Sequence, residues 1–248
     1  MGVLLSILLL LLVFAVGAVV GRLLRLTVKV PAPVLIVEAL TGALGLLSYL
    51  AFMPPAGFLL PVDSALVFSC TAYGVGLLAA WLPCDFAALA GAALSAALVF
   101  ALLCSLLAIT LRDSATREIP NALSLTVALL GLVSIFIGPT AAFPWTDHLI
   151  GAFAVSVPLL VLALVASGSF GLGDVKLMAA AGVFLGWQLV LVAACIGILI
   201  GGVYALYLLL VRKKGRKEHF AFGPALCAGI ALSLFVGQPL IIWYLGFL

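Results

Sequence analysis

The sequence predicts an all-α protein, a polytopic bundle of transmembrane helices, on three observations. Hydrophobic residues make up 67% of the 248 residues and charged residues only 8%. The mean hydropathy is +1.47, and a soluble domain of this size needs far more polar surface. Long runs almost without charge recur along the chain, and a helix that crosses a bilayer needs about 20 such residues. Basic residues gather between the runs, as they do in cytoplasmic loops.

The apolar runs, taken in order, predict about eight or nine spans in a single integral membrane domain over residues 1–248. They occupy 3–20, 33–53, 63–81, 86–111, 121–146, 149–173, 177–211 and 220–248. The first run lacks a basic region ahead of it, so we expect a retained span rather than a signal peptide. The 177–211 run is expected to hold two helices, broken near Gly186-Trp187-Gln188, the first of them short and starting close to Asp174.

The basic clusters predict the orientation of the spans. They lie at Arg22 to Lys29, at Arg112 and Arg117, and at Arg212 to Lys217, and all are assigned to the cytoplasm. Two crossings then separate Asp113 from Asp174, which places both aspartates at cytoplasmic helix ends. Three runs lie between Lys29 and Arg112, where an even number of crossings is needed. We therefore expect an additional element within 54–85.

Charge and cysteine content exclude several kinds of site. The net charge of +3 is too small to indicate a nucleic-acid partner, and the five cysteines include no C-x-x-C pair. Neither a zinc site nor a disulfide framework is indicated. The sequence therefore predicts no metal, no cofactor and no nucleic acid, with membrane lipids around the spans.

Asp113 and Asp174 are the candidate functional residues. Carboxylates are costly near a bilayer, so acidic residues beside membrane spans are functional candidates by default. Two carboxylates a few Å apart cannot both ionise readily, so one holds a proton while the other can activate water. An aspartic protease needs this combination to hydrolyse a peptide bond.

Irregular backbone is predicted beside both aspartates. Asp174 closes Gly171-Leu172-Gly173-Asp174, whose glycines allow positive φ and a close approach of another backbone. Pro120, in Ile119-Pro120-Asn121, suits the first turn of a helix. Residues 113–119 are therefore predicted to form a short loop before that helix.

Residue spacing alone does not exclude purely structural roles for Asp113, Asp174 and Lys176. Interfacial aspartates commonly cap helices or pair with arginine, and Asp113 has Arg112 and Arg117 within reach. Lys176 also suits a cation that reaches for the membrane interface. The rival classes are a transporter with intramembrane carboxylates and a non-catalytic assembly subunit. A transporter favours charges near span midpoints and internal repeats, whereas these aspartates are predicted at span ends.

The two aspartate segments resemble a known family. Gly171–Ala180, continuing through Leu185–Gln188, is similar to the signature of type IV prepilin peptidases, polytopic aspartic proteases of the G-x-G-D class. Asp113 with Ile119–Asn121 resembles the segment that carries the first catalytic aspartate of that family. The resemblance extends over most of the chain in the expected order.

Two further segments resemble the same family, and one departs from it. Phe222–Pro224 resembles its P-F-G-P element, with Ala221 in place of the first proline, and Glu38–Gly42 resembles its E-L-x-T-G segment. Bacterial members usually carry two C-x-x-C pairs in the loop between their first two spans, where zinc binds. Here that loop is reduced to about Gly21–Ala32 and has no cysteine. The resemblance therefore gives no support for N-methylation, the activity associated with that region.

The resemblance implies an aspartic endopeptidase of the inner membrane that cleaves without metal or covalent intermediate. Its substrate would be a prepilin or pseudopilin, cut at the cytoplasmic face to release a basic leader for pilus assembly or type II secretion. Asp113 and Asp174 would be catalytic. The residues that would bind substrate or support the site are Gly171, Gly173, Lys176, Pro120 and Asn121. A preflagellin-type peptidase, also built without the zinc loop, is the alternative within this class.

Overall fold

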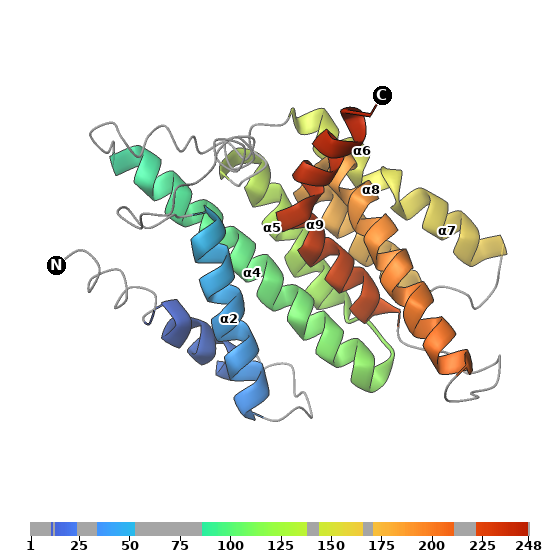
Figure 1. Cartoon of the computed structure of the whole chain (residues 1–248), viewed down its shortest axis with the longest axis horizontal. Coiled ribbons are helices and arrows are strands. Elements are labelled where there is room, and N and C mark those ends of the chain that lie inside the picture. The colour runs from blue at the N-terminus through green and yellow to red at the C-terminus, as the bar shows by residue number, and fades with distance from the viewer. Residues whose placement is uncertain are drawn as a thin grey trace. The chain divides into compact units, whose positions relative to one another are not determined.

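The described part of the chain is entirely helical in its regular elements (Figure 1). The computed structural model describes residues 11, 13–23, 34–52, 86–137, 144–165, 171–210 and 222–247. The helices are α2 Val34–Phe52, α4 Phe86–Thr116, α5 Asn121–Ile137, α6 Trp145–Ala154, α7 Ser156–Val165, α8 Leu172–Leu210 and α9 Gly223–Leu245, and a short helix, Val13–Leu23, precedes α2. The all-α prediction is confirmed, whereas the element expected within 54–85 lies outside the described residues.

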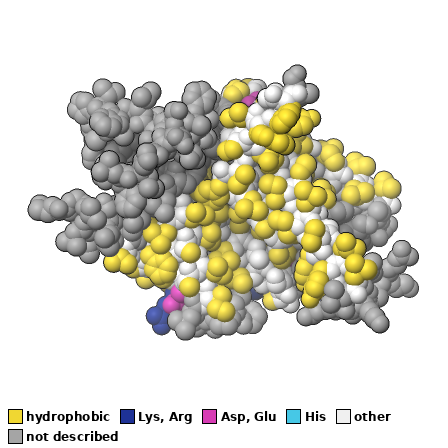
Figure 2. All heavy atoms as spheres, viewed as in Figure 1, with side chains coloured by type: hydrophobic (Ala, Val, Ile, Leu, Met, Phe, Trp, Pro, Cys, Tyr) yellow, Lys and Arg dark blue, Asp and Glu magenta, His cyan; other side chains and the backbone are white. Residues whose placement is uncertain are grey.

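The helices are those of a multi-pass membrane protein. Within the described residues, four segments are long and apolar enough to cross a membrane: Leu94–Thr116, Trp145–Val165, Leu172–Leu208 and Gly223–Leu245. Figure 2 shows hydrophobic side chains over most of the coloured surface and very few charged ones. Large side chains such as Leu164 (70% exposed) and Val203 (69% exposed) face outward. Apolar side chains can face lipid tails without a free-energy cost, whereas their exposure to water is unfavourable.

The chain divides into two compact units, which are described separately. The first comprises Met1–Cys104 with Val133–Ala142, and the second comprises Ser105–Leu132 with Phe143–Leu248. Both aspartates belong to the second unit. The long helix α4 contributes its first part to one unit and its last part, with Asp113, to the other.

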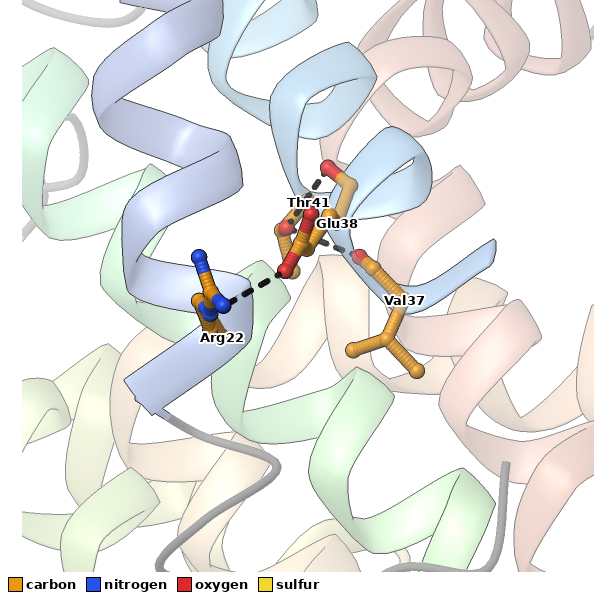
Figure 3. A network of polar contacts seen from close by, with 4 residues as sticks. All are labelled: Arg22, Val37, Glu38 and Thr41. Carbon is orange, nitrogen blue, oxygen red and sulfur yellow. Dashed lines mark hydrogen bonds and ion pairs between the residues drawn. The ribbon is translucent and has the colours of Figure 1, made fainter. Parts of the chain in front are cut away.

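In the first unit, glycines let the helix Val13–Leu23 approach α2 closely. A Cβ on Gly17 would lie 2.6 Å from the Thr41 carbonyl oxygen, and one on Gly21 would lie 3.0 Å from that of Val37. The Thr41 hydroxyl turns back on its own helix and donates to the carbonyls of Val37 (2.8 Å) and Glu38 (3.0 Å) (Figure 3). Thr41, from the segment that resembles E-L-x-T-G, is therefore part of a helix–helix contact.

One ion pair joins the same two helices. Arg22 Nε lies 3.8 Å from Glu38 Oε1, and the arginine side chain is 74% exposed (Figure 3). Oε1 is itself buried and has no hydrogen-bond partner among the described residues. At that length and exposure the pair contributes about 0.5 kcal/mol or less to stability.

In the second unit, α8 is the central helix and packs against α9, α6 and α7. Glycines mark its two closest crossings. A Cβ on Gly182 would overlap the carbonyl of Gly151 in α6, and a Cβ on Gly229 in α9 would lie 2.7 Å from the amide nitrogen of Gly197. Small residues at membrane helix crossings allow such close backbone packing. The crossings fix where the N-terminal ends of α8 and α9 lie.

The predicted break in the 177–211 run is confirmed as a kink. Gly186 has φ 78° and ψ 173°, a backbone conformation that only glycine adopts readily. A break of this kind deprives nearby carbonyls of their in-helix donors. The Val183 carbonyl, three residues earlier, accepts a hydrogen bond of 2.8 Å from Nδ1 of the buried His148 in α6. The first half of α8 is therefore short and begins beside Asp174, as expected.

Candidate active site

Asp113 lies in the last turn of α4, so the prediction of a loop over 113–119 was wrong for its first four residues. The hydroxyls of Ser114 and Thr116 donate to the carbonyls of Thr110 (2.7 Å) and Arg112 (3.0 Å), one turn back. These bonds let the polar end of the helix continue beyond the apolar run. The helix stops at Arg117, whose φ of 57° is left-handed and whose amide donates to the Asp113 carbonyl at 2.8 Å. The connector is thus only 117–120.

Pro120 caps the next helix rather than occupying its first turn. Its carbonyl accepts from the amides of Leu123 (3.1 Å) and Ser124 (3.3 Å), and α5 begins at Asn121. The residue before the first helical position commonly accepts such bonds. The proline therefore ends the connector and starts α5 in a defined direction.

Asp174 lies in the first turn of α8, folded back onto the residue that precedes the helix. Its amide donates to the Gly171 carbonyl at 3.0 Å, and the Gly171 amide donates to Asp174 Oδ2 at 3.4 Å. The only described glycine with positive φ is Gly186, so Gly171 and Gly173 do not use that freedom. Gly173 provides close approach instead, because a Cβ there would lie 3.0 Å from Cβ of Ile119.

The two aspartates are buried together in the second unit. Asp113 is 5% exposed and Asp174 is 7% exposed, and the charges of the two carboxylates act on each other. Gly223, the first residue of α9, donates its backbone N–H to Asp113 Oδ2 at 3.1 Å. The end of α4 and the starts of α8 and α9 therefore meet around one pair of carboxyls.

A second set of contacts ties the connector to α8. Lys176 Nζ donates to Asn121 Oδ1 at 3.0 Å on the exposed side of the site. Lys176 is thus bonded to α5, a role that the interpretation as a lone interfacial cation did not include. With the contact between Ile119 and Gly173, this bond holds the connector after Asp113 against the turn that carries Asp174. All the residues predicted to support the site belong to this arrangement or to the turn at Gly171.

Two residues of the site were not among the sequence predictions. Gly223 was predicted only as part of the segment that resembles the P-F-G-P element, and no role was predicted for Cys227. Cys227 is 3% exposed and interacts with the Thr110 hydroxyl and with the charges of both aspartates. The two residues are four apart on α9, which puts them on one helix face. This spacing of four residues is the sequence feature that could have predicted that Gly223 and Cys227 face the same site.

The arrangement supplies acid–base chemistry in a site mostly shielded from water. Two neighbouring carboxyls that share a proton can act together as base and acid on a bound water. Among the described residues, no group of three or more His, Cys, Asp or Glu is arranged to hold a metal ion.

The comparisons with known proteins concern the part of the chain that contains both aspartates. Residues 100–206 match the model of the type IV leader peptidase family. This part of the chain is similar to that family. The family segment contains Asp113, the connector, Asp174 and the kinked first half of α8. Gly223 and Cys227 lie beyond it.

Several curated relatives carry the name prepilin leader peptidase/N-methyltransferase. That of Aeromonas salmonicida is 31% identical over 146 residues, which cover 57% of this chain and 50% of the relative. That of Burkholderia pseudomallei is 37% identical over 161 residues, covering 60% and 48%, and that of Bacillus subtilis is 33% identical over 101 residues, covering 41% of each. The chain thus matches about half the length of these leader peptidase relatives. No solved structure matches it.

Proposed function

We propose that this chain is a prepilin leader peptidase, an aspartic endopeptidase that uses Asp113 and Asp174. The observation that carries the proposal is the buried pair of carboxyls at three helix ends, both inside the segment that matches the leader peptidase family. Structural helix caps need neither mutual proximity nor burial of both charges, and burying like charges together is costly unless they share a proton.

The reaction is hydrolysis of one peptide bond by the pair. The ionised carboxylate takes a proton from water as the water oxygen bonds to the scissile carbonyl carbon, and the protonated carboxyl donates its proton to the carbonyl oxygen. The C–N bond then breaks, the amine takes the proton gained from water, and a hydroxyl of the diol returns a proton to the other carboxyl. Atoms balance with one water consumed, and the pair ends as it began.

The supporting residues hold the two carboxyls in fixed positions relative to each other. The Lys176–Asn121 bond and the Ile119–Gly173 contact fix the connector that follows Asp113. Pro120 sets the start of α5, and Gly171 holds the Asp174 side chain by its amide. Small displacements of catalytic groups cost large factors in rate, so these contacts matter more to turnover than to stability.

The substrates we propose are type IV prepilins or pseudopilins, whose basic leader is removed for pilus assembly or type II secretion. The enzyme is then a multi-pass protein of the inner membrane, one domain over 1–248 with eight or nine spans, and both aspartates face the cytoplasm. N-methylation is not part of the proposal, because the segment Gly21–Ala32 offers no cysteine.

Co-expression of the chain with a candidate prepilin tests the proposal, with the leader followed by gel mobility and mass spectrometry. Wild type should release the leader, and Asp113→Asn or Asp174→Asn should not, while both variants insert in the membrane normally. Asp147→Asn is the matched control, because Asp147 opens α6 beside the kink at Gly186, more than three helical turns along α8 from Asp174. Leader removal by either variant of the pair would sink the proposal.

A further inference from the structure

Gly223 brings the N-terminus of α9 directly onto Asp113. A Cβ on Gly223 would lie 2.6 Å from Asp113 Oδ2 and 2.9 Å from its Cγ, so no side chain fits between the backbone and the carboxyl. The amides of the first helical turn have no partner within the helix. The next residue is Pro224, which has no amide hydrogen. Gly223 is thus the residue whose amide α9 directs at the pair.

The environments of the two carboxyls differ. Asp113 Oδ2 accepts the Gly223 amide at 3.1 Å, from a different helix and in a buried position. Asp174 Oδ2 accepts the Gly171 amide at 3.4 Å, from its own turn and in a partly buried position. Both carboxyls lie at the N-terminus of a helix, α9 for Asp113 and α8 for Asp174, so the helix dipoles favour the negative form of both. The shorter and more buried hydrogen bond favours the negative form of Asp113 more strongly.

We propose that Gly223 is a positioning residue of the reaction, which holds Asp113 as the ionised carboxylate so that Asp113 activates the water and Asp174 carries the proton. The inference rests on the proposed function and adds a division of roles to it. Asp113 takes the proton from water, and Asp174 protonates the oxygen of the scissile carbonyl. Gly223 acts through Asp113, to which its amide donates.

The groups around Asp113 are consistent with this division. The titratable groups that face it from the described helices include Asp174 from α8 and Cys227 from α9, and Arg112 precedes it on α4. A neighbouring carboxylate opposes a second negative charge. Once the Gly223 amide favours the charge on Asp113, the shared proton stays on Asp174.

Gly223→Ala tests the role of the amide, because the added methyl must push the carboxylate away from it. We expect kcat on a prepilin to fall about ten- to hundredfold with KM nearly unchanged. The acid limb of the rate profile should move up by about one pH unit, since Asp113 then ionises less readily. Gly202→Ala is the control, because a Cβ on Gly202 meets nothing within 4 Å, and it should keep the wild-type rate and profile. Equal rates for Gly223→Ala and wild type, or an acid limb that does not move, would overturn the inference.

A second measurement needs no cleavage and covers the case in which Gly223→Ala does not fold. Infrared spectra of the purified protein, followed through mildly acidic pH, should show a protonated-carboxyl band that is absent in Asp174→Asn. In Asp113→Asn the band should remain but be lost at lower pH than in wild type, because burial still opposes the charge on Asp174 while the neighbouring carboxylate is gone. The reverse pattern overturns the division of roles even if the chain cleaves prepilins. A wild type that cleaves no prepilin but shows the expected band would instead refute the proposed function alone.

Discussion

The same substitution, glycine to alanine, should have opposite effects at two positions of α8. Gly182 lies at the crossing with α6, where a Cβ would overlap the carbonyl of Gly151 and lie 2.9 Å from the amide nitrogen of Ala152. Gly202 lies on the exposed side of the same helix, where a Cβ meets nothing within 4 Å. Comparing the two variants separates helix propensity from helix packing.

The expected magnitudes follow from these contacts. At Gly202, alanine removes only the conformational disadvantage of glycine, a gain of about 0.5–1 kcal/mol. At Gly182 the same gain is opposed by overpacking of about 1–3 kcal/mol, because the obstructing atoms belong to the α6 backbone and cannot rotate away. The net change at Gly182 is a loss of up to about 2.5 kcal/mol.

Reversible unfolding in mixed detergent micelles, followed by circular dichroism, measures both changes against wild type. Gly202→Ala should move the midpoint to higher denaturant and Gly182→Ala to lower denaturant. If Gly182→Ala is as stable as Gly202→Ala, α6 and α8 are not in backbone contact at this crossing. The reasoning that places the start of α8 would then fail.

Two further substitutions test contacts at the rim of the site and in the first unit. Lys176→Met should lower the cleavage rate severalfold and the free energy of unfolding by about 1 kcal/mol or less, and Asn121→Ala should do the same. Because the two side chains form a single hydrogen bond, the double variant should lose no more activity or stability than either single variant in a double-mutant cycle. Additive losses would show that the two side chains do not interact. Arg22→Gln should change the free energy of unfolding by no more than about 0.5 kcal/mol in the detergent titration, and a larger loss would show that the pair with Glu38 is stronger than its 3.8 Å separation indicates.

Much of the framework could be predicted because membrane helices obey simple composition rules. Apolar runs predicted the positions of α4, α5, α8 and α9, and the glycine at 186 marked the kink. Counting two crossings between the aspartates predicted that Asp113 and Asp174 both lie at the cytoplasmic face, which stays a prediction. These predictions depend only on local composition and on whether the number of membrane crossings between two loops is even or odd. Both can be read from a single sequence.

The details of the site could not be predicted in the same way. Ser114 and Thr116 extend α4 through hydroxyl bonds to their own helix, which composition does not distinguish from a polar loop. The Lys176–Asn121 bond joins residues 55 apart and the Gly223–Asp113 bond joins residues 110 apart in sequence. Such pairings depend on how the helices cross. The glycine contacts decide those crossings, and the spacing of 25 glycines in a single chain does not reveal which of them touch.

The most direct test of the account is single-turnover cleavage of a purified prepilin by the purified chain in proteoliposomes. Wild type, Asp113→Asn and Asp174→Asn are compared at equal folded concentration. We predict that wild type releases the leader and that each variant loses activity by roughly a thousandfold or more, since neither carboxyl can work alone. Release of the leader by either variant at a rate near that of wild type would contradict the claim that these two aspartates form one catalytic pair.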